Sequence, residues 1–247
     1  MLFKNRFNKE APPNMKAFAK TLLFEAVRDN DVSKAGQILS QYHSSISWEQ
    51  GGELALNVAI AHGSFGVVHL FIRKGADPEK SDKMGFNALT SAARSLDLAG
   101  VMKIVDMLKP RGVDVNTCDA QGRTMLHVAV EKSKDDLVQA LLQAGARIDV
   151  RDRDGKTALM KAVTRKNLQA VETLLDAGAD LKIATAKGET ALSMARALHA
   201  TDPLYLAELE KVFQNTIDAR YERLTAPINK GTTTTVRILP KIVIRKP

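Results

Sequence analysis

The chain has 247 residues, of which 45% are hydrophobic and only 5% aromatic, and its formal net charge is +8. Its single cysteine, Cys118, excludes an internal disulfide and a metal site built from cysteines. No stretch approaches the roughly 18 apolar residues of a membrane span, and the N-terminus lacks the apolar run of a signal peptide. We therefore expect a soluble protein of the cytoplasm, with a core of Leu, Val, Ile, Met and Ala.

The positive charge is concentrated at the two ends of the chain. Residues 1–20 carry +4 and residues 226–247 carry +5, which leaves −1 for residues 21–225. Basic ends can contact nucleic acid, anionic lipid or an acidic protein, or they can be solvated segments that aid solubility. The basic character therefore belongs to the ends and not to the body of the chain.

A repeated sequence pattern runs through the body of the chain. Short helices are predicted to start at intervals of 33, 33, 37, 33 and 33 residues, at Thr21, Leu54, Asn87, Thr124, Thr157 and Thr190. The corresponding units begin near residues 17, 49, 82, 119, 152 and 185. Such a period is typical of a solenoid, in which each unit buries its apolar face only against its neighbours.

The first three units are irregular. The segment SQYHSSISWEQGGE, residues 40–53, replaces the short turn that links the later units. In the second unit, HGSFG at residues 62–66 superficially suggests a phosphate-binding loop, but it falls at the turn between two helices, and we assign it to that turn. The third unit carries four extra residues within 95–112, which predict a longer second helix or a bulged loop and a local change in curvature.

Units four and five are the most regular. In unit four, four apolar residues share one face of a helix, namely Leu137, Val138, Leu141 and Leu142. Gly145 follows this helix at the place where a left-handed residue caps it. Gly75, Gly112 and Gly178 have the same position in their units. The pattern therefore predicts a unit of two short helices, the second of which ends at a glycine.

The last unit pairs ALSMARALHA with a longer helix that ends near residue 224, and we expect this helix to cover the open end of the stack. The repeat pattern is lost in residues 225–247, where a threonine run and Gly231 break any helix. We expect this basic tail to be flexible on its own. Two alternatives are a strand that adds to the edge of a partner's sheet and a C-terminal export signal.

The sequence GRTMLHVA at residues 122–129, with its regularly spaced counterparts, resembles the ankyrin family, whose 33-residue unit carries a Gly-x-Thr-Pro-Leu-His-x-Ala signature. The resemblance covers roughly residues 17–216. It implies an all-α ankyrin-repeat solenoid of about six helix–turn–helix units with β-turn fingertips and capped ends. Residues 1–16 would then be a basic N-terminal segment, residues 217–224 the end of the capping helix, and residues 225–247 the tail.

The chain departs from the family pattern at two positions of the signature. The proline is replaced in every unit, by Leu22, Ala55, Ala88, Met125, Ala158 and Ala191. These residues can start a helix but lack the fixed φ of proline, so we expect a less rigid array. In the first unit, Phe24 stands at the histidine position.

The resemblance also implies where a partner would bind, because ankyrin repeats contact partners through the fingertips and the first helix of each unit. The corresponding residues are Lys83, Met84, Phe86, Arg94, Arg123, Lys132, Arg151, Arg153, Lys156, Arg165 and Lys187. Nine of these are basic, and only Glu131, Asp154 and Glu189 are acidic at comparable positions. Since the body as a whole is at −1, we predict a positive concave face that favours an acidic partner, with Met84 and Phe86 as an apolar anchor.

Catalytic patterns are absent from the sequence. It contains no P-loop, dinucleotide fingerprint or HExxH motif. Cys118 lies in an inter-repeat turn, and no base is implied beside it. His127 lies within the signature, where the family resemblance implies a local hydrogen bond that fixes the turn. We therefore predict a protein that is not an enzyme and that needs no metal, cofactor or small-molecule substrate.

The leading hypothesis is a monomeric scaffold or adaptor that binds another protein through the concave groove. One alternative is a nucleic-acid or anionic-membrane binder that uses the basic ends, with binding that falls steeply as salt rises. Another is a bacterial effector that is exported into a host cell and binds a protein there.

Overall fold

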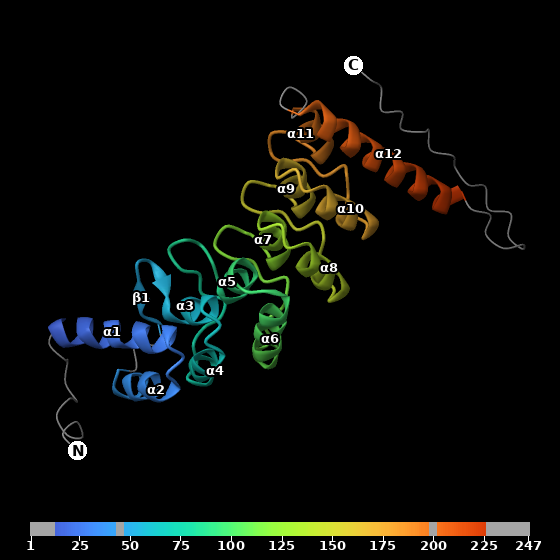
Figure 1. The fold of residues 1–247 in the computed structure, drawn as a ribbon. Helices are drawn as coiled ribbons and strands as arrows, with labels where there is room; N and C mark the ends of the chain where they lie inside the picture. The colour runs from blue at the N-terminus through green and yellow to red at the C-terminus, as the bar shows by residue number, and fades with distance from the viewer. Residues whose placement is uncertain (1–12, 43–46, 198–201, 226–247) are drawn as a thin grey trace, which may run out of the picture.

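The computed structural model describes residues 13–42, 47–197 and 202–225. Within them, helices pair into an elongated stack (Figure 1). The pairs are α1 (Pro13–Arg28) with α2 (Val32–Gln41), α3 (Ala55–Ala61) with α4 (Phe65–Arg73), α5 (Ala88–Ser95) with α6 (Leu98–Leu108), α7 (Met125–Glu131) with α8 (Asp135–Gln143), α9 (Ala158–Thr164) with α10 (Leu168–Asp176), and α11 (Ala191–Ala197) with α12 (Pro203–Thr225). The predicted helical solenoid of about six units is confirmed.

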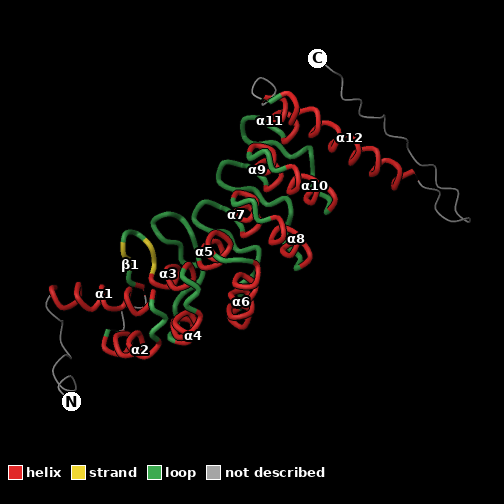
Figure 2. The backbone as a smooth tube through the Cα atoms, viewed as in Figure 1, coloured by secondary structure: helices red, strands yellow, loops and turns green. Residues whose placement is uncertain are grey.

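The loops that connect units lie along one side of the stack, next to the first helix of each pair, and the second helices form the other side (Figure 2). One of these loops is a hairpin of two short antiparallel strands, β1 (Glu49–Gln50) and β2 (Glu53–Leu54). It occupies the segment that breaks the repeat pattern. Gly51 and Gly52 form its turn with φ values of 62° and 92°, which a two-residue hairpin loop favours and glycine adopts without strain.

Most predicted helix starts are confirmed. Leu54, Asn87, Thr124 and Thr157 are the N-caps of α3, α5, α7 and α9, and Thr190 directly precedes α11. Thr157 Oγ1 accepts a hydrogen bond from the backbone N–H of Met160 at 3.4 Å, as an N-cap hydroxyl does.

The predicted start at Thr21 is wrong. Helix α1 begins at Pro13, and Thr21 lies inside it, where its Oγ1 donates to the carbonyl of Ala17 at 3.2 Å. No glycine or aspartate occurs between residues 13 and 20 to end the helix, and proline at the first position suits a helix start. Helix α1 therefore extends into the segment expected to precede the repeats.

One apolar core runs through the stack, from Leu23 and Phe24 in α1 to Leu209 and Phe213 in α12. The first helices pack on one another without a break, from α1 through α3, α5, α7 and α9 to α11. In the second row, α2, α4 and α6 pack in one series and α8, α10 and α12 in another, whereas α6 and α8 make few contacts. The first helices therefore form a continuous row of packed helices along the stack.

The break in the second row falls where the third unit is longer. Helix α6 has 11 residues where α4, α8 and α10 have 9, and the 3-10 turn η2 (Lys109–Arg111) follows it. The predicted longer second helix is confirmed. Lys134, the N-cap of α8, spans the junction, since its Nζ donates to the carbonyls of Arg94 at 3.2 Å and Leu96 at 2.5 Å. Its positive charge also interacts favourably with the negative end of the α5 helix dipole, which lies at the C-terminus of that helix.

Helix α12 packs on α10 and α11 at the end of the stack. Its 23 residues make it far longer than the other second helices. It buries Tyr205, Leu206, Leu209 and Phe213, and the Tyr205 hydroxyl donates to the carbonyl of Val163 at 3.3 Å. The predicted contributions of residues 1–12 and of the tail, 226–247, lie outside the described residues.

Removing a core leucine should destabilise the stack strongly. Leu141 in α8 is 1% exposed. We expect Leu141→Ala to lower the free energy of unfolding by roughly 2–5 kcal/mol, because truncation removes apolar contacts and leaves a cavity. Gln139→Ala, at an exposed position of the same helix, is the matched control and should change stability by less than about 0.5 kcal/mol. Urea denaturation followed by circular dichroism measures both, and equal losses would contradict the assignment of Leu141 to the core.

A second prediction concerns the turn between the paired helices. Ser133 has a φ of 52°, and its equivalents Asn30, Gly63 and Lys166 have 53°, 66° and 57°. The left-handed region costs a residue with a Cβ about 1–2 kcal/mol, which exceeds the extra backbone entropy that glycine loses on folding. We therefore expect Ser133→Gly to raise the free energy of unfolding by about 0.5–1 kcal/mol. Ser133→Ala keeps the strain and should be neutral, and a gain in both variants would exclude this explanation.

Candidate partner-binding surface

Four fingertip turns, residues 82–86, 119–123, 152–156 and 185–189, line the side of the stack next to the first helices. In the third turn, Asp152 Oδ1 accepts hydrogen bonds from the backbone N–H groups of Asp154 at 3.0 Å and Lys156 at 2.9 Å. Asp82 and Asp119 make the same pair of bonds in their turns, and the hydroxyl of Thr185 does so in the last. A buried side chain therefore fixes each turn from within.

The fingertip turns are also joined to one another. The backbone N–H of Lys83 donates to the carbonyl of Gly52, that of Ala120 to Gly85, and that of Arg153 to Gln121, at 2.9 to 3.1 Å. Glycine is required at this close approach, because a Cβ on Gly122 would lie 3.0 Å from the backbone nitrogen of Arg153, and its φ is 72°. The hairpin and the turns at 82–86, 119–123 and 152–156 therefore form a row with fixed spacing.

Three of the predicted site residues come together beneath this row. The guanidinium carbons of Arg94 and Arg123 each lie 4.3 Å from the ring centroid of Phe86. Arg94 also pairs with Glu53 at 3.2 Å, and Arg123 with Asp119 at 2.9 Å. The side chains of Arg94 and Arg123 are only 21% and 14% exposed. This cluster ties units two, three and four together and covers part of Phe86, which is half-buried, whereas Met84 is 54% exposed.

A second ionic cluster joins units four and five. Lys161 Nζ lies 2.6 Å from Glu131 Oε1 and 2.7 Å from Asp152 Oδ2, and Glu131 Oε2 lies 3.7 Å from Arg123 Nη1. All of these side chains are less than one fifth exposed. Burial lowers the pKa of the Lys161 ammonium, but its bonds to the two carboxylates outweigh burial and raise the pKa above its ordinary value. The cluster is therefore charged, and its acidic and basic groups satisfy one another.

The other predicted cations remain on the surface. Lys83, Lys132, Arg151, Arg153, Arg165 and Lys187 are exposed, and Lys156 is half-buried. Lys83 lies 3.9 Å from Glu49. In the part of the chain that the structure describes, no ion pair is found for Lys132, Arg151, Arg153, Lys156, Arg165 or Lys187, and we call these six residues the basic edge.

Comparison with known proteins agrees with this architecture. The family model described as ankyrin repeats (3 copies) matches residues 65–152, 91–185 and 133–202, which together exceed half of the chain. The chain belongs to the ankyrin-repeat family. Ankyrin repeats generally mediate protein–protein interactions, and the family is typically non-enzymatic.

Two solved structures show the extent of the similarity to other ankyrin-repeat proteins. The ankyrin repeat domain of Bcl-3, described as a unique member of the IkappaB protein family, is 25% identical with a TM-score of 0.63, and the match covers 80% of this chain and 85% of that one. An ankyrin repeat domain from Acinetobacter baumannii is 28% identical with a TM-score of 0.60, over 78% of this chain and 96% of that one. Both matches extend over most of the repeat body.

The ankyrin histidine position shows how units of different sequence are joined. His127 Nε2 lies 3.2 Å from the carbonyl of Lys156 in the next fingertip turn, and Thr124 N–H donates to its Nδ1 at 3.2 Å. Asn57 has the equivalent place in unit two, where its Nδ2 donates to the carbonyl of Phe86 at 2.8 Å. The expected structural role of His127 is therefore seen in its contacts, and an asparagine makes the same bond between units.

Sequence reasoning missed several residues of this side. Lys161, which joins Glu131 to Asp152, lies inside a first helix. The sequence predicted contact residues only in the fingertip turns and at the ends of the first helices. Trp48 and Lys20 lie at the N-terminal end of the groove beside the β1–β2 hairpin. The available signal was that the only tryptophan of the chain falls in the segment that breaks the repeat period.

The described residues include few groups that could support catalysis or metal binding. Among the described residues, no group of three or more His, Cys, Asp or Glu is placed to hold a metal ion. Cys118 is exposed, although the surrounding protein shields part of its thiol. This partial burial and, to a smaller extent, the nearby Asp119 carboxylate raise the pKa of the thiol, which reduces the thiolate that a nucleophile requires. The described helices also include none with the length and apolar character needed to cross a bilayer.

The environment of His127 predicts a pH dependence of stability. Burial lowers the pKa of its imidazole and outweighs the hydrogen bond to the Lys156 backbone, which raises it; the nearby Lys161 ammonium adds to the lowering, and the carboxylates of Asp152 and Glu131 oppose it. Because the folded protein holds this imidazole neutral, the unfolded chain binds more protons below the ordinary histidine pKa of about 6.5. The stabilisation is therefore complete above that pH and is lost as the pH falls through it.

His127→Asn tests this expectation, because asparagine supplies the same bond to the next turn in unit two. We expect the wild-type protein to lose more stability than His127→Asn between about pH 7.5 and 5.5, as measured by urea denaturation at each pH. Asp152 titrates in a different range: burial raises the pKa of its carboxyl, but bonds from Lys161 and the Lys156 N–H outweigh burial and hold it below its ordinary value. Parallel pH profiles of the two proteins would show that His127 is not responsible.

Proposed function

We propose that this ankyrin-repeat protein is a non-catalytic adaptor that binds an acidic partner protein through the basic edge. The observation that carries the proposal is the separation of its cations into two groups. Arg94, Arg123 and Lys161 are mostly buried and paired with carboxylates of the chain itself. The six residues of the basic edge have no such partner among the described residues.

The basic edge follows the C-terminal half of the groove. Arg151, Arg153 and Lys156 belong to or adjoin one fingertip turn, and Lys187 belongs to the next. The exposed acids of these two turns are Asp154 and Glu189. Glu131 adds no negative charge to the surface, because Lys161 and Arg123 engage it. An acidic partner would therefore be steered to this half of the groove and held by several cations.

The rigidity of the edge supports binding as well as steering. The backbones of the two turns are fixed by Asp152 and Thr185, and the turn that carries Arg153 is also joined to the preceding turn, so the backbone that carries these cations is ordered before a partner arrives. A preformed surface loses less entropy on association than one that must become ordered. We propose that the protein acts as a monomer, since α12 packs on α10 and α11 at the end of the stack and exposes Glu208, Lys211 and Asn215.

The test is the affinity of poly-L-glutamate for a charge-reversal variant, Arg153→Glu/Arg165→Glu/Lys187→Glu. We expect the variant to bind at least about tenfold more weakly than wild type, by isothermal titration calorimetry at low salt. Arg123 is left unchanged, because its reversal would place a third carboxylate beside Asp119 and Glu131 and destabilise the stack.

The matched control is Lys74→Glu/Arg147→Glu/Lys182→Glu. It changes the net charge equally at exposed residues that lie at or after the ends of second helices. This control should lose less than about threefold in affinity. Equal losses in both variants would show a response to net charge and contradict a basic edge. Tighter binding of a short DNA duplex, lost when residues 226–247 are removed, would favour the nucleic-acid alternative.

A further inference from the structure

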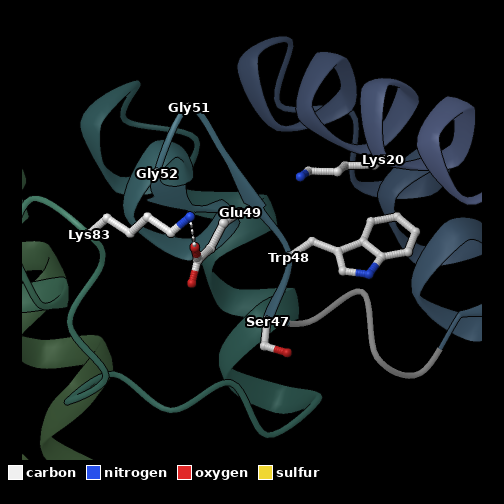
Figure 3. A pocket seen from close by; sticks show the side chains of 7 residues that line it. All are labelled: Lys20, Ser47, Trp48, Glu49, Gly51, Gly52 and Lys83. Carbon is white, nitrogen blue, oxygen red and sulfur yellow. Dashed lines mark ion pairs between the residues drawn. The ribbon is translucent and has the colours of Figure 1, made fainter.

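We infer that the N-terminal end of the groove holds a second protein-binding pocket, which takes an extended acidic segment carrying an apolar side chain next to its carboxylates. The pocket is lined by Lys20, Ser47, Trp48, Glu49, Gly51, Gly52 and Lys83 and has a volume of about 600 Å³ (Figure 3). The inference shares with the proposed function only the premise that the protein binds acidic protein ligands. It concerns different residues, at the other end of the stack.

The pocket exists because this chain departs from the regular repeat. The β1–β2 hairpin stands in place of a simple fingertip turn, and α1 lies beside it on the N-terminal side (Figure 1). Gly51 and Gly52 carry no side chain over the mouth of the pocket. Gly52 cannot be replaced without a shift, because an added Cβ would lie 3.2 Å from Lys83 Cβ and its φ is 92°. The backbone of the turn therefore stays open to a ligand.

Trp48 gives the pocket an apolar wall. Its indole packs against the ring of Tyr42, with centroids 5.7 Å apart, and it is partly buried. A tryptophan held by a neighbouring ring provides a large contact area at little entropic cost, and this is why tryptophan is enriched among residues that dominate binding energy. An aliphatic side chain of a ligand can therefore pack on the indole without rearrangement.

Two ammonium groups flank this wall. Lys20 extends from α1 above Trp48 toward the hairpin, and Lys83 extends from the next fingertip turn on the other side (Figure 3). The described residues offer Lys20 no ion-pair partner. Lys83 has a 77% exposed side chain and lies 3.9 Å from Glu49, a distance and exposure at which an ion pair contributes little. Both ammonium groups are therefore available to carboxylates of a ligand.

The two ammonium groups and the indole determine which ligand the pocket favours. One carboxylate can meet Lys20 and another Lys83, on either side of an aliphatic group that packs on Trp48. An extended segment of the pattern Asp-x-Leu-x-Asp suits this arrangement, because side chains two residues apart point to the same face of an extended chain. The single acid of the pocket, Glu49, leaves a net positive charge and disfavours basic segments.

Trp48 is the only tryptophan in the chain, so intrinsic tryptophan fluorescence reports on this pocket alone. We expect the peptide acetyl-Asp-Ser-Leu-Ser-Asp-amide to cause a saturable change in the emission of the full-length protein. The same peptide with lysine in place of aspartate should cause none. Lys20→Gln/Lys83→Gln should weaken the response at least about tenfold. Lys74→Gln, at an exposed site on the second-helix side, should leave it unchanged, and circular dichroism confirms that each variant is folded.

Several results would overturn the inference. These are an equal response to the lysine peptide, an undiminished response in Lys20→Gln/Lys83→Gln, or a response to a short DNA duplex in place of the acidic peptide. The Arg153→Glu/Arg165→Glu/Lys187→Glu variant separates this site from the basic edge. It should keep the Trp48 response while losing poly-L-glutamate affinity. Loss of the Trp48 response in that variant would place the peptide on the basic edge, so the pocket would fail while the proposed function stood.

Discussion

A pair of short helices cannot bury its own apolar face, and this constraint determines the rest of the molecule. Each unit of this protein gains its core only from the units on either side, so the first helices must pack in one unbroken row. The fingertip turns must then keep the same spacing as the helices. Asp82, Asp119 and Asp152 achieve this, since each carboxylate holds its own turn while the turn backbones bond to one another. A surface of fixed geometry is a direct result of the way the core is built.

The same packing decides which charges are available for binding. Arg123 and Lys161 are drawn between units, where they neutralise Asp119, Asp152 and Glu131. Buried pairs of this kind contribute to the register between units, and their carboxylates no longer oppose an acidic ligand. Arg153, which follows Asp152 directly, and Lys187, in the next turn, have no ion-pair partner among the described residues. Under the proposed function, the cations that stabilise the stack and the cations that bind a partner would therefore come from the same side of the repeats.

Much of the fold follows from the sequence because its signals are local. A threonine or asparagine before an apolar run, and a glycine before or after it, fix the bounds of α5, α7 and α9 through caps and turns that involve few residues. The same local pattern wrongly predicted a helix start at Thr21. Helix α1 begins earlier because no residue between Pro13 and Thr21 ends it. The burial of Arg123 and the pocket beside Trp48 could not be predicted, because both depend on side chains brought together from different units. Local patterns specify elements, whereas pairing between units is a property of the assembled stack.

The interruption between α6 and α8 gives the molecule an uneven elasticity. On the fingertip side, the helices form a continuous row and the turns are linked by backbone hydrogen bonds, so this side resists stretching. On the opposite side, the longer α6 leaves a junction with few helix contacts, where Lys134 Nζ donates to the Leu96 carbonyl and the Arg147 N–H donates to Asn116 Oδ1. We therefore expect flexing of the stack to be concentrated on one side and at one unit. Such a joint would change the distance between the two ends of the groove while leaving the local geometry at each end intact.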